Sequence, residues 1–150
     1  MEVFLHKICG QPVQPPVSMQ LRRCTPEQAP AVYALQNEVR AAMPDPEQFV
    51  PDGRSAHNYA AFMDVPRTEC EHCANADSAI VHADFRGNGL QRLMLEAALP
   101  LFPKKITHIG ATVSPQNQYS LHNALASGFA IVSRREMYGG HDRYLLAKEL

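Results

Sequence analysis

The residues from Arg86 to Gly89 have the types and the spacing that suit a phosphate-binding turn. Gly87 and Gly89 tolerate positive φ, so consecutive backbone N–H groups can converge on one anion. A strand-length apolar run, residues 78–83, precedes the turn, and residues 90–98 follow it with apolar side chains at helical spacing. The start of a helix adds unpaired N–H groups and a positive dipole end. This stretch therefore predicts a strand, a glycine turn and a helix that together bind a phosphate or pyrophosphate.

Two other phosphate motifs are absent from the chain. It contains no G-x-x-x-x-G-K followed by Ser or Thr, which excludes a P-loop, and no G-x-G-x-x-G, which excludes the dinucleotide fingerprint. Glycine turns also join strands to helices for purely structural reasons, so the turn taken alone leaves both interpretations open.

The turn resembles the acyl-coenzyme A motif of the GNAT acetyltransferases, in which Arg or Gln is followed by Gly three positions on and by Gly or Ala two positions later. Arg86 and Gly89 match this pattern, whereas Gln91 stands where the family usually has Gly or Ala. A second match follows, because residues 106–113 are of strand type and the next helical segment carries Asn117 near its start and Gly-Phe at its end. The resemblance covers roughly residues 19–150. The sequence of the two matching stretches is similar to that of an uncharacterised bacterial branch of the family.

The resemblance implies an α/β fold with a GNAT-like mixed sheet and helices on both faces. Residues 78–83 and 106–113 would form its parallel central pair, with antiparallel strands flanking them. Acetyl-CoA would be the cosubstrate, its diphosphate at the turn and its pantetheine arm between the two central strands. The implied cofactor-binding residues are Ile80, Val81, His82, Arg86, Gly87, Asn88, Gly89, Leu90, Gln91, Asn117 and Ser120. Asn117 is also expected to cap its helix, and it can hold both roles at once.

The chemistry that the resemblance implies is direct attack of an amine on the thioester. Its rate comes mainly from proximity and from N–H groups that face the oxyanion. The family's usual acid lies four residues ahead of the Gly-Phe glycine, and Ala124 occupies that position here. Tyr119 and Tyr138 are the candidates to replace it, although each is otherwise an ordinary, partly buried tyrosine. The base is left open among an ordered water, Glu69, Glu71, His82 and His122.

The two ends of the chain carry local signals. Residues 1–18 contain prolines where a strand would need N–H donors, so they are expected to form an extended tail before a single domain at residues 19–150. Residues 25–28, Thr-Pro-Glu-Gln, predict a helix start, and the helix should end near Met43, with Glu38 on its solvated face. Residues 131–150 contain two strand-like runs around a glycine pair and predict a hairpin.

The segment from Pro44 to Asn75 is too short and too rich in proline for the helix and hairpin that the family places there. We therefore expect part of the N-terminal half of the sheet to be missing. Such a loss exposes a strand edge, and an exposed edge favours a homodimer.

Composition limits the class of protein. The chain has 150 residues, 45% of them hydrophobic, which suits one domain with its own core. A net charge of −1 without a basic run gives no reason to expect nucleic acid as a partner, and no apolar stretch has membrane-spanning length. The N-terminus lacks a signal-peptide pattern, so a cytoplasmic protein is expected.

Cys70 and Cys73 have the spacing of half a zinc site, but a second pair is missing. Reduced thiols and no metal are therefore expected, with a redox role for the pair left open.

Two functions follow from the sequence. The first is an N-acetyltransferase that moves the acetyl group of acetyl-CoA to the amine of a small molecule or peptide. The alternative is a non-catalytic acyl-CoA-binding or interaction module derived from such an enzyme. The family resemblance favours the acetyltransferase, whereas Ala124 and the short middle segment favour the alternative.

Overall fold

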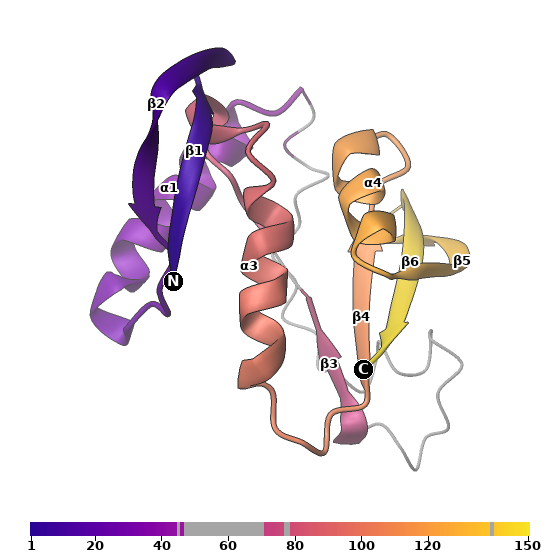
Figure 1. Ribbon diagram of the computed structural model, residues 1–150. Coiled ribbons are helices and arrows are strands. Elements are labelled where there is room, and N and C mark those ends of the chain that lie inside the picture. Colours follow the sequence, from indigo (N-terminus) through magenta and orange to yellow (C-terminus); the bar gives the residue numbers. More distant parts are fainter. Residues whose placement is uncertain (45, 47–70, 77–78, 139) are drawn as a thin grey trace. The chain divides into compact units, whose positions relative to one another are not determined.

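The computed structural model describes residues 1–44, 46, 71–76, 79–138 and 140–150 (Figure 1). The chain divides into two compact units, and each is described here by itself. The first comprises residues 1–49 and 79–94, and the second comprises residues 50–78 and 95–150. Helix α3, Leu90–Ala98, supplies residues to both units.

The first unit begins with an antiparallel hairpin of strands β1, Glu2–Ile8, and β2, Gln11–Gln20. Val3 and Leu5 are buried while the residues between them are exposed, which is the alternation of a strand with one covered face. Residues 2–8 and 11–20 thus pair with each other, which the sequence analysis did not expect of an extended tail at residues 1–18. The division into this tail and a single domain at residues 19–150 stays a prediction. The prolines of β2 are tolerated because both strands of a two-stranded sheet are edge strands, on which a missing N–H can face solvent.

The ladder of this hairpin is interrupted at His6. Leu5 pairs with Val17 but Lys7 pairs with Pro12, so residues 13–16 bulge out of β2 opposite a single residue of β1. A bulge of this kind leaves backbone groups without ladder partners. The His6 and Lys7 amides are satisfied from another part of the chain, as described below.

Helix α1, Ala29–Ala41, follows a short 3-10 turn, η1, at Pro26–Gln28. The predicted start is confirmed, because the Gln28 side-chain oxygen accepts a hydrogen bond from the Thr25 N–H at 3.0 Å. The predicted end is also confirmed, because the helix stops shortly before Pro44.

The second unit contains a four-stranded sheet in the order β3-β4-β6-β5 (Figure 1). Its strands are β3, Cys73–Asn75; β4, His108–Val113; β5, Ala130–Met137; and β6, His141–Glu149. β3 and β4 are parallel, and the other two pairs are antiparallel. The mixed α/β class, its parallel pair and the C-terminal hairpin are thus confirmed.

The position of the parallel strand differs from the prediction. β4 pairs with residues 73–75 rather than with the run at residues 78–83. Residues 79–82 have no regular secondary structure, and residues 83–85 form a 3-10 turn, η4; Ser78 lies outside the described residues. A short apolar run cannot be identified as a strand by periodicity alone, which explains the error.

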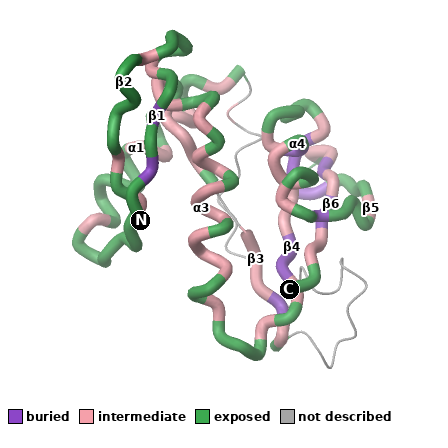
Figure 2. Tube along the Cα trace, viewed as in Figure 1, coloured by how far each residue is buried: buried purple, intermediate pink, exposed green. Residues whose placement is uncertain are grey.

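The core of the second unit lies between this sheet and the helices of the same unit. Its buried residues are Ile109, Val113, Leu121, Phe129 and Leu146, and most of them are strand residues of β4 and β6 or lie on helix α4, Gln118–Ala126 (Figure 2). Leu95, Leu99 and Phe102 pack against this cluster from the end of α3 and the turn after it. Ile109 and Val113 are four residues apart on β4, so their side chains point to the same face of the sheet. Helix α4 and the end of α3 therefore both cover this face.

Helix α4 ends in a Schellman motif. Gly128 has a φ of 85°, the Phe129 N–H donates to the Ala124 carbonyl at 3.1 Å, and the Gly128 N–H donates to the Leu125 carbonyl at 3.0 Å. The Gly-Phe pair that the sequence places at the end of this helix thus caps it, and Phe129 is buried in the core.

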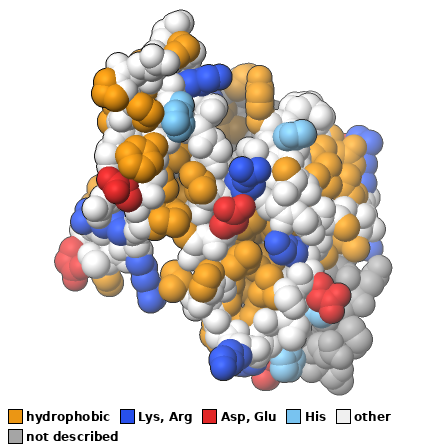
Figure 3. Space-filling view, viewed as in Figure 1, with side chains coloured by type: hydrophobic (Ala, Val, Ile, Leu, Met, Phe, Trp, Pro, Cys, Tyr) orange, Lys and Arg blue, Asp and Glu red, His pale blue; other side chains and the backbone are white. Residues whose placement is uncertain are grey.

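Within the described part of the chain, none of the helices combines the length and the apolar character needed to cross a membrane. Apolar, basic and acidic side chains are interspersed on the face drawn in Figure 3. Most of the segment predicted to be short, from Pro44 to Asn75, lies outside the described residues, so the missing strands and the homodimer stay predictions.

Candidate functional site

The glycine turn has the backbone conformation that the sequence predicts. Gly87 and Gly89 have φ values of 83° and 69°, and α3 begins at Leu90. No described residue accepts a hydrogen bond from the N–H groups of residues 87–90. A Cβ atom built on Gly89 meets nothing within 4 Å, so this side of the turn is open. The turn therefore presents a row of unsatisfied donors at the positive end of a helix.

Asn88 lies in the turn, and its side chain faces the N-terminal hairpin. Its Oδ1 accepts hydrogen bonds from the N–H groups of His6, at 2.8 Å, and Lys7, at 3.0 Å. Its Nδ2 donates to the carbonyls of Lys7, at 2.8 Å, and Phe85, at 2.9 Å. The Asn88 side chain is therefore already bonded within the protein, and only its backbone N–H can make the predicted contact with the cofactor.

Lys7 also lies along the turn. A Cβ atom built on Gly87 would be 3.5 Å from the Cδ atom of Lys7, so the lysine stem passes over this glycine. Among the described residues, no carboxylate is within ion-pair distance of the Lys7 ammonium. Lys7 and Arg86 therefore bring positive charge to the turn. No local pattern in the sequence pointed to Lys7, which lies 80 residues before Gly87.

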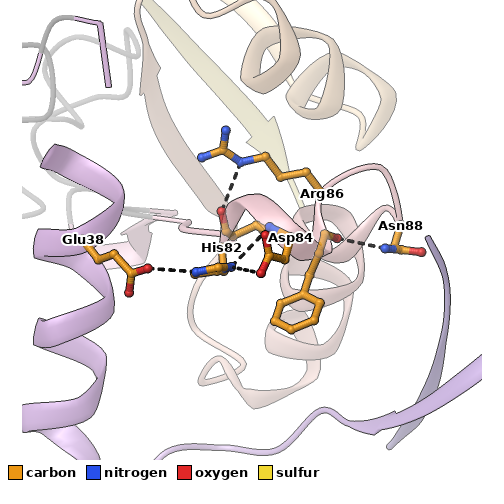
Figure 4. A network of polar contacts seen from close by, with 7 residues as sticks. Glu38, His82, Asp84, Arg86 and Asn88 are labelled. Carbon is orange, nitrogen blue, oxygen red and sulfur yellow. Dashed lines mark hydrogen bonds and ion pairs between the residues drawn. The ribbon is translucent and has the colours of Figure 1, made fainter. Parts of the chain in front are cut away.

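His82, just before the turn, contacts a helix residue that is distant in sequence (Figure 4). Its Nε2 lies 2.9 Å from Oε1 of Glu38, and its Nδ1 accepts the Asp84 N–H at 3.2 Å. Because Nδ1 accepts, the neutral ring carries its proton on Nε2 and donates it to Glu38. The Asp84 carboxylate is 3.7 Å from Nδ1. Glu38, assigned by the sequence only to the solvated face of its helix, thus has a specific partner.

Two further contacts hold the approach to the turn. The Arg86 Nε donates to the Val81 carbonyl at 3.3 Å, so the arginine side chain folds back over residues 81–86 (Figure 4). The Cys9 N–H donates to the Asp84 carbonyl at 2.7 Å. A hydrogen bond from the Cys9 thiol to the Asp84 side chain raises the pKa of that thiol.

The remaining predicted site residues belong to the second unit. Asn117 caps α4, because its Oδ1 accepts the Ser120 N–H at 3.0 Å, which confirms the structural role proposed for it. The Tyr119 side chain is fully accessible, with 89% of the residue exposed. The Tyr138 hydroxyl lies 3.1 Å from Oγ1 of Thr112, and the Arg143 guanidinium stacks over its ring at 5.4 Å. These residues belong to the second unit, whereas the glycine turn belongs to the first.

Ala124, where the family's acid is expected, packs against the core of the second unit. Its carbonyl also accepts the Phe129 N–H of the Schellman motif. Of the candidate bases, His122 and Glu71 are exposed and Glu69 lies outside the described residues.

The cysteine pair does not form a metal centre that the structure can describe. Cys73 is buried in β3, and Cys70 lies outside the described residues. Among the residues that the structure places, no three or more His, Cys, Asp or Glu side chains gather closely enough to hold a metal ion.

Comparison with known proteins gave few matches. No protein-family model matches the chain, and no curated protein matches it. Among solved structures, it is similar to an acetyltransferase of the GNAT family from Streptococcus pneumoniae, with 25% identity and a TM-score of 0.46. The match covers 53% of this chain and 51% of that protein, so the chain spans about half of its length. A TM-score below 0.5 does not establish a shared fold.

Proposed function

We propose that this chain is a GNAT-like N-acetyltransferase that binds acetyl-CoA at the glycine turn and transfers the acetyl group to the amine of a small molecule or peptide. The observation that carries the proposal is the turn itself. Its N–H groups at residues 87–90 make no bond among the described residues, and they follow Arg86 in the stretch whose Arg86 and Gly89 match the acyl-CoA motif.

The diphosphate of coenzyme A is the part of the ligand that this turn suits. Convergent N–H groups and the positive end of α3 favour an anion, and they need no side-chain rearrangement to do so. Lys7 and Arg86 add positive charge beside the turn. Gln91 adds bulk where the family has a small residue, but it does not remove an N–H donor from the turn.

The pantetheine arm would use the backbone before the turn. Residues 79–82 form no sheet ladder in the described structure, so backbone groups of Ile80 and Val81 are not consumed by a neighbouring strand. An amide-containing arm can hydrogen-bond to such groups in the way that an added strand does. The side chain of His82 would lie at this end of the arm, beside Glu38.

The reaction needs little from side chains. The amine nitrogen bonds to the thioester carbonyl carbon, the C–S bond breaks with its electron pair on sulfur, and the thiolate takes up a proton as the amine loses one. Holding the two reactants together supplies most of the rate. Tyr119 and Tyr138 remain the candidate acids, and water can replace either of them.

One observation favours the alternative function, a non-catalytic acyl-CoA-binding module. At the position of the family's acid, the Ala124 side chain packs into the core, and a tyrosine there would have to displace those contacts. The same turn would then bind the ligand without turnover.

Two measurements test the proposal. Calorimetry with coenzyme A, acetyl-CoA and pantetheine asks whether the turn binds the nucleotide part, and a ligand at 100 times its Kd should raise the free energy of unfolding by about 2.7 kcal/mol. Thiol release from acetyl-CoA with a panel of amines then separates the enzyme from the binding module. Binding without thiol release supports the alternative, and the absence of binding by either coenzyme would overturn both.

A further inference from the structure

We infer that Asn88 is a positioning residue, and that its side chain couples the N-terminal hairpin to the conformation of the glycine turn. The ligand side of this inference rests on the proposed function, whereas the coupling between hairpin and turn stands on the contacts alone. Those contacts join residues that are 81 and 82 positions apart in the sequence.

The hydrogen-bonding capacity of the Asn88 side chain is fully used. Its oxygen accepts two N–H groups of β1, and its amide nitrogen donates to one carbonyl of β1 and to one carbonyl of the turn. A primary amide has two acceptor and two donor sites. Because the four bonds point in different directions, they hold the backbone at Asn88 in a defined position relative to the backbone of β1.

The hairpin supplies the groups that need this partner. The bulge at residues 13–16 leaves His6 without a residue opposite it in β2. Lys7 is opposite Pro12, which has no N–H to give to a ladder. Asn88 therefore satisfies backbone groups that the hairpin cannot satisfy itself.

Two other contacts act on either side of Asn88. The Cys9 N–H bonds to the Asp84 carbonyl at 2.7 Å, four residues before Asn88, and the Lys7 stem lies over Gly87. Both glycines of the turn have a positive φ, and the N–H groups of residues 87–90 make no bond among the described residues. β1 therefore helps to maintain the conformation that exposes these donors.

Thermodynamic coupling follows from this arrangement. An anion that binds the exposed N–H groups favours the conformation that the hairpin also favours, so ligand and hairpin stabilise each other. Loosening the hairpin should lower the affinity for the ligand, and ligand binding should protect the hairpin amides from hydrogen exchange.

Amide hydrogen exchange of the full chain tests the coupling without any ligand. In N88A, which removes all four bonds, exchange at His6 and Lys7 should accelerate about tenfold or more, since two protecting bonds are lost. N88D keeps the acceptor and loses the donor, so both amides should stay protected if the protein is otherwise intact. N37A is the matched control, because Asn37 is an exposed residue of α1 whose side chain makes no hydrogen bond to a described residue. The amides of β4 and β6 report whether the second unit remains folded.

Calorimetry on the same variants tests the ligand side. Coenzyme A affinity should fall about tenfold in N88A, the equivalent of 1.4 kcal/mol, and stay unchanged in N37A. Unchanged exchange at His6 and Lys7 in N88A overturns the inference, as does faster exchange with full coenzyme A affinity. If the natural protein binds no coenzyme, the proposed function fails, and the exchange experiment still decides whether the hairpin positions the turn.

Discussion

The imidazole Nε2 of His82 and the carboxylate Oε1 of Glu38 lie 2.9 Å apart and join residues that are 44 positions apart in the sequence. The bond links α1 to the segment before the glycine turn. The side chains are 29% and 64% exposed, so water screens the pair and keeps its contribution modest.

Replacing Glu38 tests how much this bond contributes. Glu38→Ala should lower the free energy of unfolding by less than about 1 kcal/mol, as is usual for an exposed pair. Glu38→Gln should lower it less, because the amide oxygen still accepts from the imidazole. Urea denaturation at pH 7 measures both variants. A loss of several kcal/mol in Glu38→Gln would show that the carboxylate does more than accept this bond.

The turn glycines should not tolerate a side chain. Gly87→Ala and Gly89→Ala place an L-residue at φ values of 83° and 69°, which costs about 1–2 kcal/mol in strain. An added Cβ meets only an ordinary contact with Lys7 at Gly87 and nothing at Gly89, so the cost comes from the backbone.

Gly140→Ala is the matched control for those two variants, because Gly140 has a φ of 109° and open space around it but lies between β5 and β6 in the second unit. All three variants should be destabilised by similar amounts in urea denaturation. Only Gly87→Ala and Gly89→Ala should also change coenzyme A affinity. Equal affinity changes in all three would disconnect the glycine turn from binding.

The Cys9 thiol should be a slow nucleophile for an exposed cysteine. Its hydrogen bond to Asp84 raises the pKa of the thiol, so less thiolate is present near pH 8. Cys9 should therefore react with iodoacetamide more slowly than Cys24, which is also exposed. Asp84→Asn should accelerate the reaction at Cys9 and leave Cys24 unchanged, as peptide mass spectrometry can show. Equal rates at the two cysteines in the natural protein would contradict the prediction.

The pair of Arg134 and Asp142 should make stability depend on acid pH. The Arg134 guanidinium donates to both Asp142 carboxylate oxygens, at 2.8 and 3.0 Å from its Nε, and lowers the pKa of Asp142. A lowered folded-state pKa contributes stability that is present above the unfolded value, about 3.9, and is lost as the pH falls through the folded value.

Asp142→Asn should remove that contribution. Its urea-denaturation midpoint should change less than that of the natural protein as the pH falls below about 4. Asp84→Asn, which alters a carboxylate of the other unit, controls for a general loss of negative charge. Parallel pH profiles of Asp142→Asn and the natural protein would show that the pair does not act in solution.

Leu146 measures the packing of the second unit. It is completely buried in the core cluster, so Leu146→Ala should lower the free energy of unfolding by about 2–5 kcal/mol. Leu125→Ala is the control, because Leu125 is 43% exposed on α4 and should lose much less. Thermal or urea unfolding that follows the second unit measures the difference. Similar losses at the two positions would contradict the described core.

Local signals in the sequence predicted local structure well. Thr25 and Gln28 at the start of α1, Asn117 at the start of α4 and Gly128 at its end all have the roles that their types and spacing indicate, because a cap is decided within one helical turn. The positive φ values of the turn glycines were predictable for the same reason.

Structure that depends on distant partners was not predictable in this way. The apolar run at residues 78–83 is strand-like in composition, but β4 pairs with residues 73–75, and no periodic pattern distinguishes the two segments. The prolines of residues 1–18 indicated that no strand forms there. They are tolerated because β2 has a free edge, and that edge exists only once the hairpin has folded. The direction of the Asn88 side chain depends on where β1 lies, which its neighbours in sequence do not reveal.

The separation between β1 and Asn88 also has a consequence for biosynthesis. The hairpin is synthesised before Asn88, and the side chain that completes its backbone bonds is made 82 residues after His6. At about 5–20 residues per second, the nascent hairpin waits several seconds with open N–H groups and two free strand edges. During that interval the newborn chain is most exposed to wrong pairing or to capture by a chaperone.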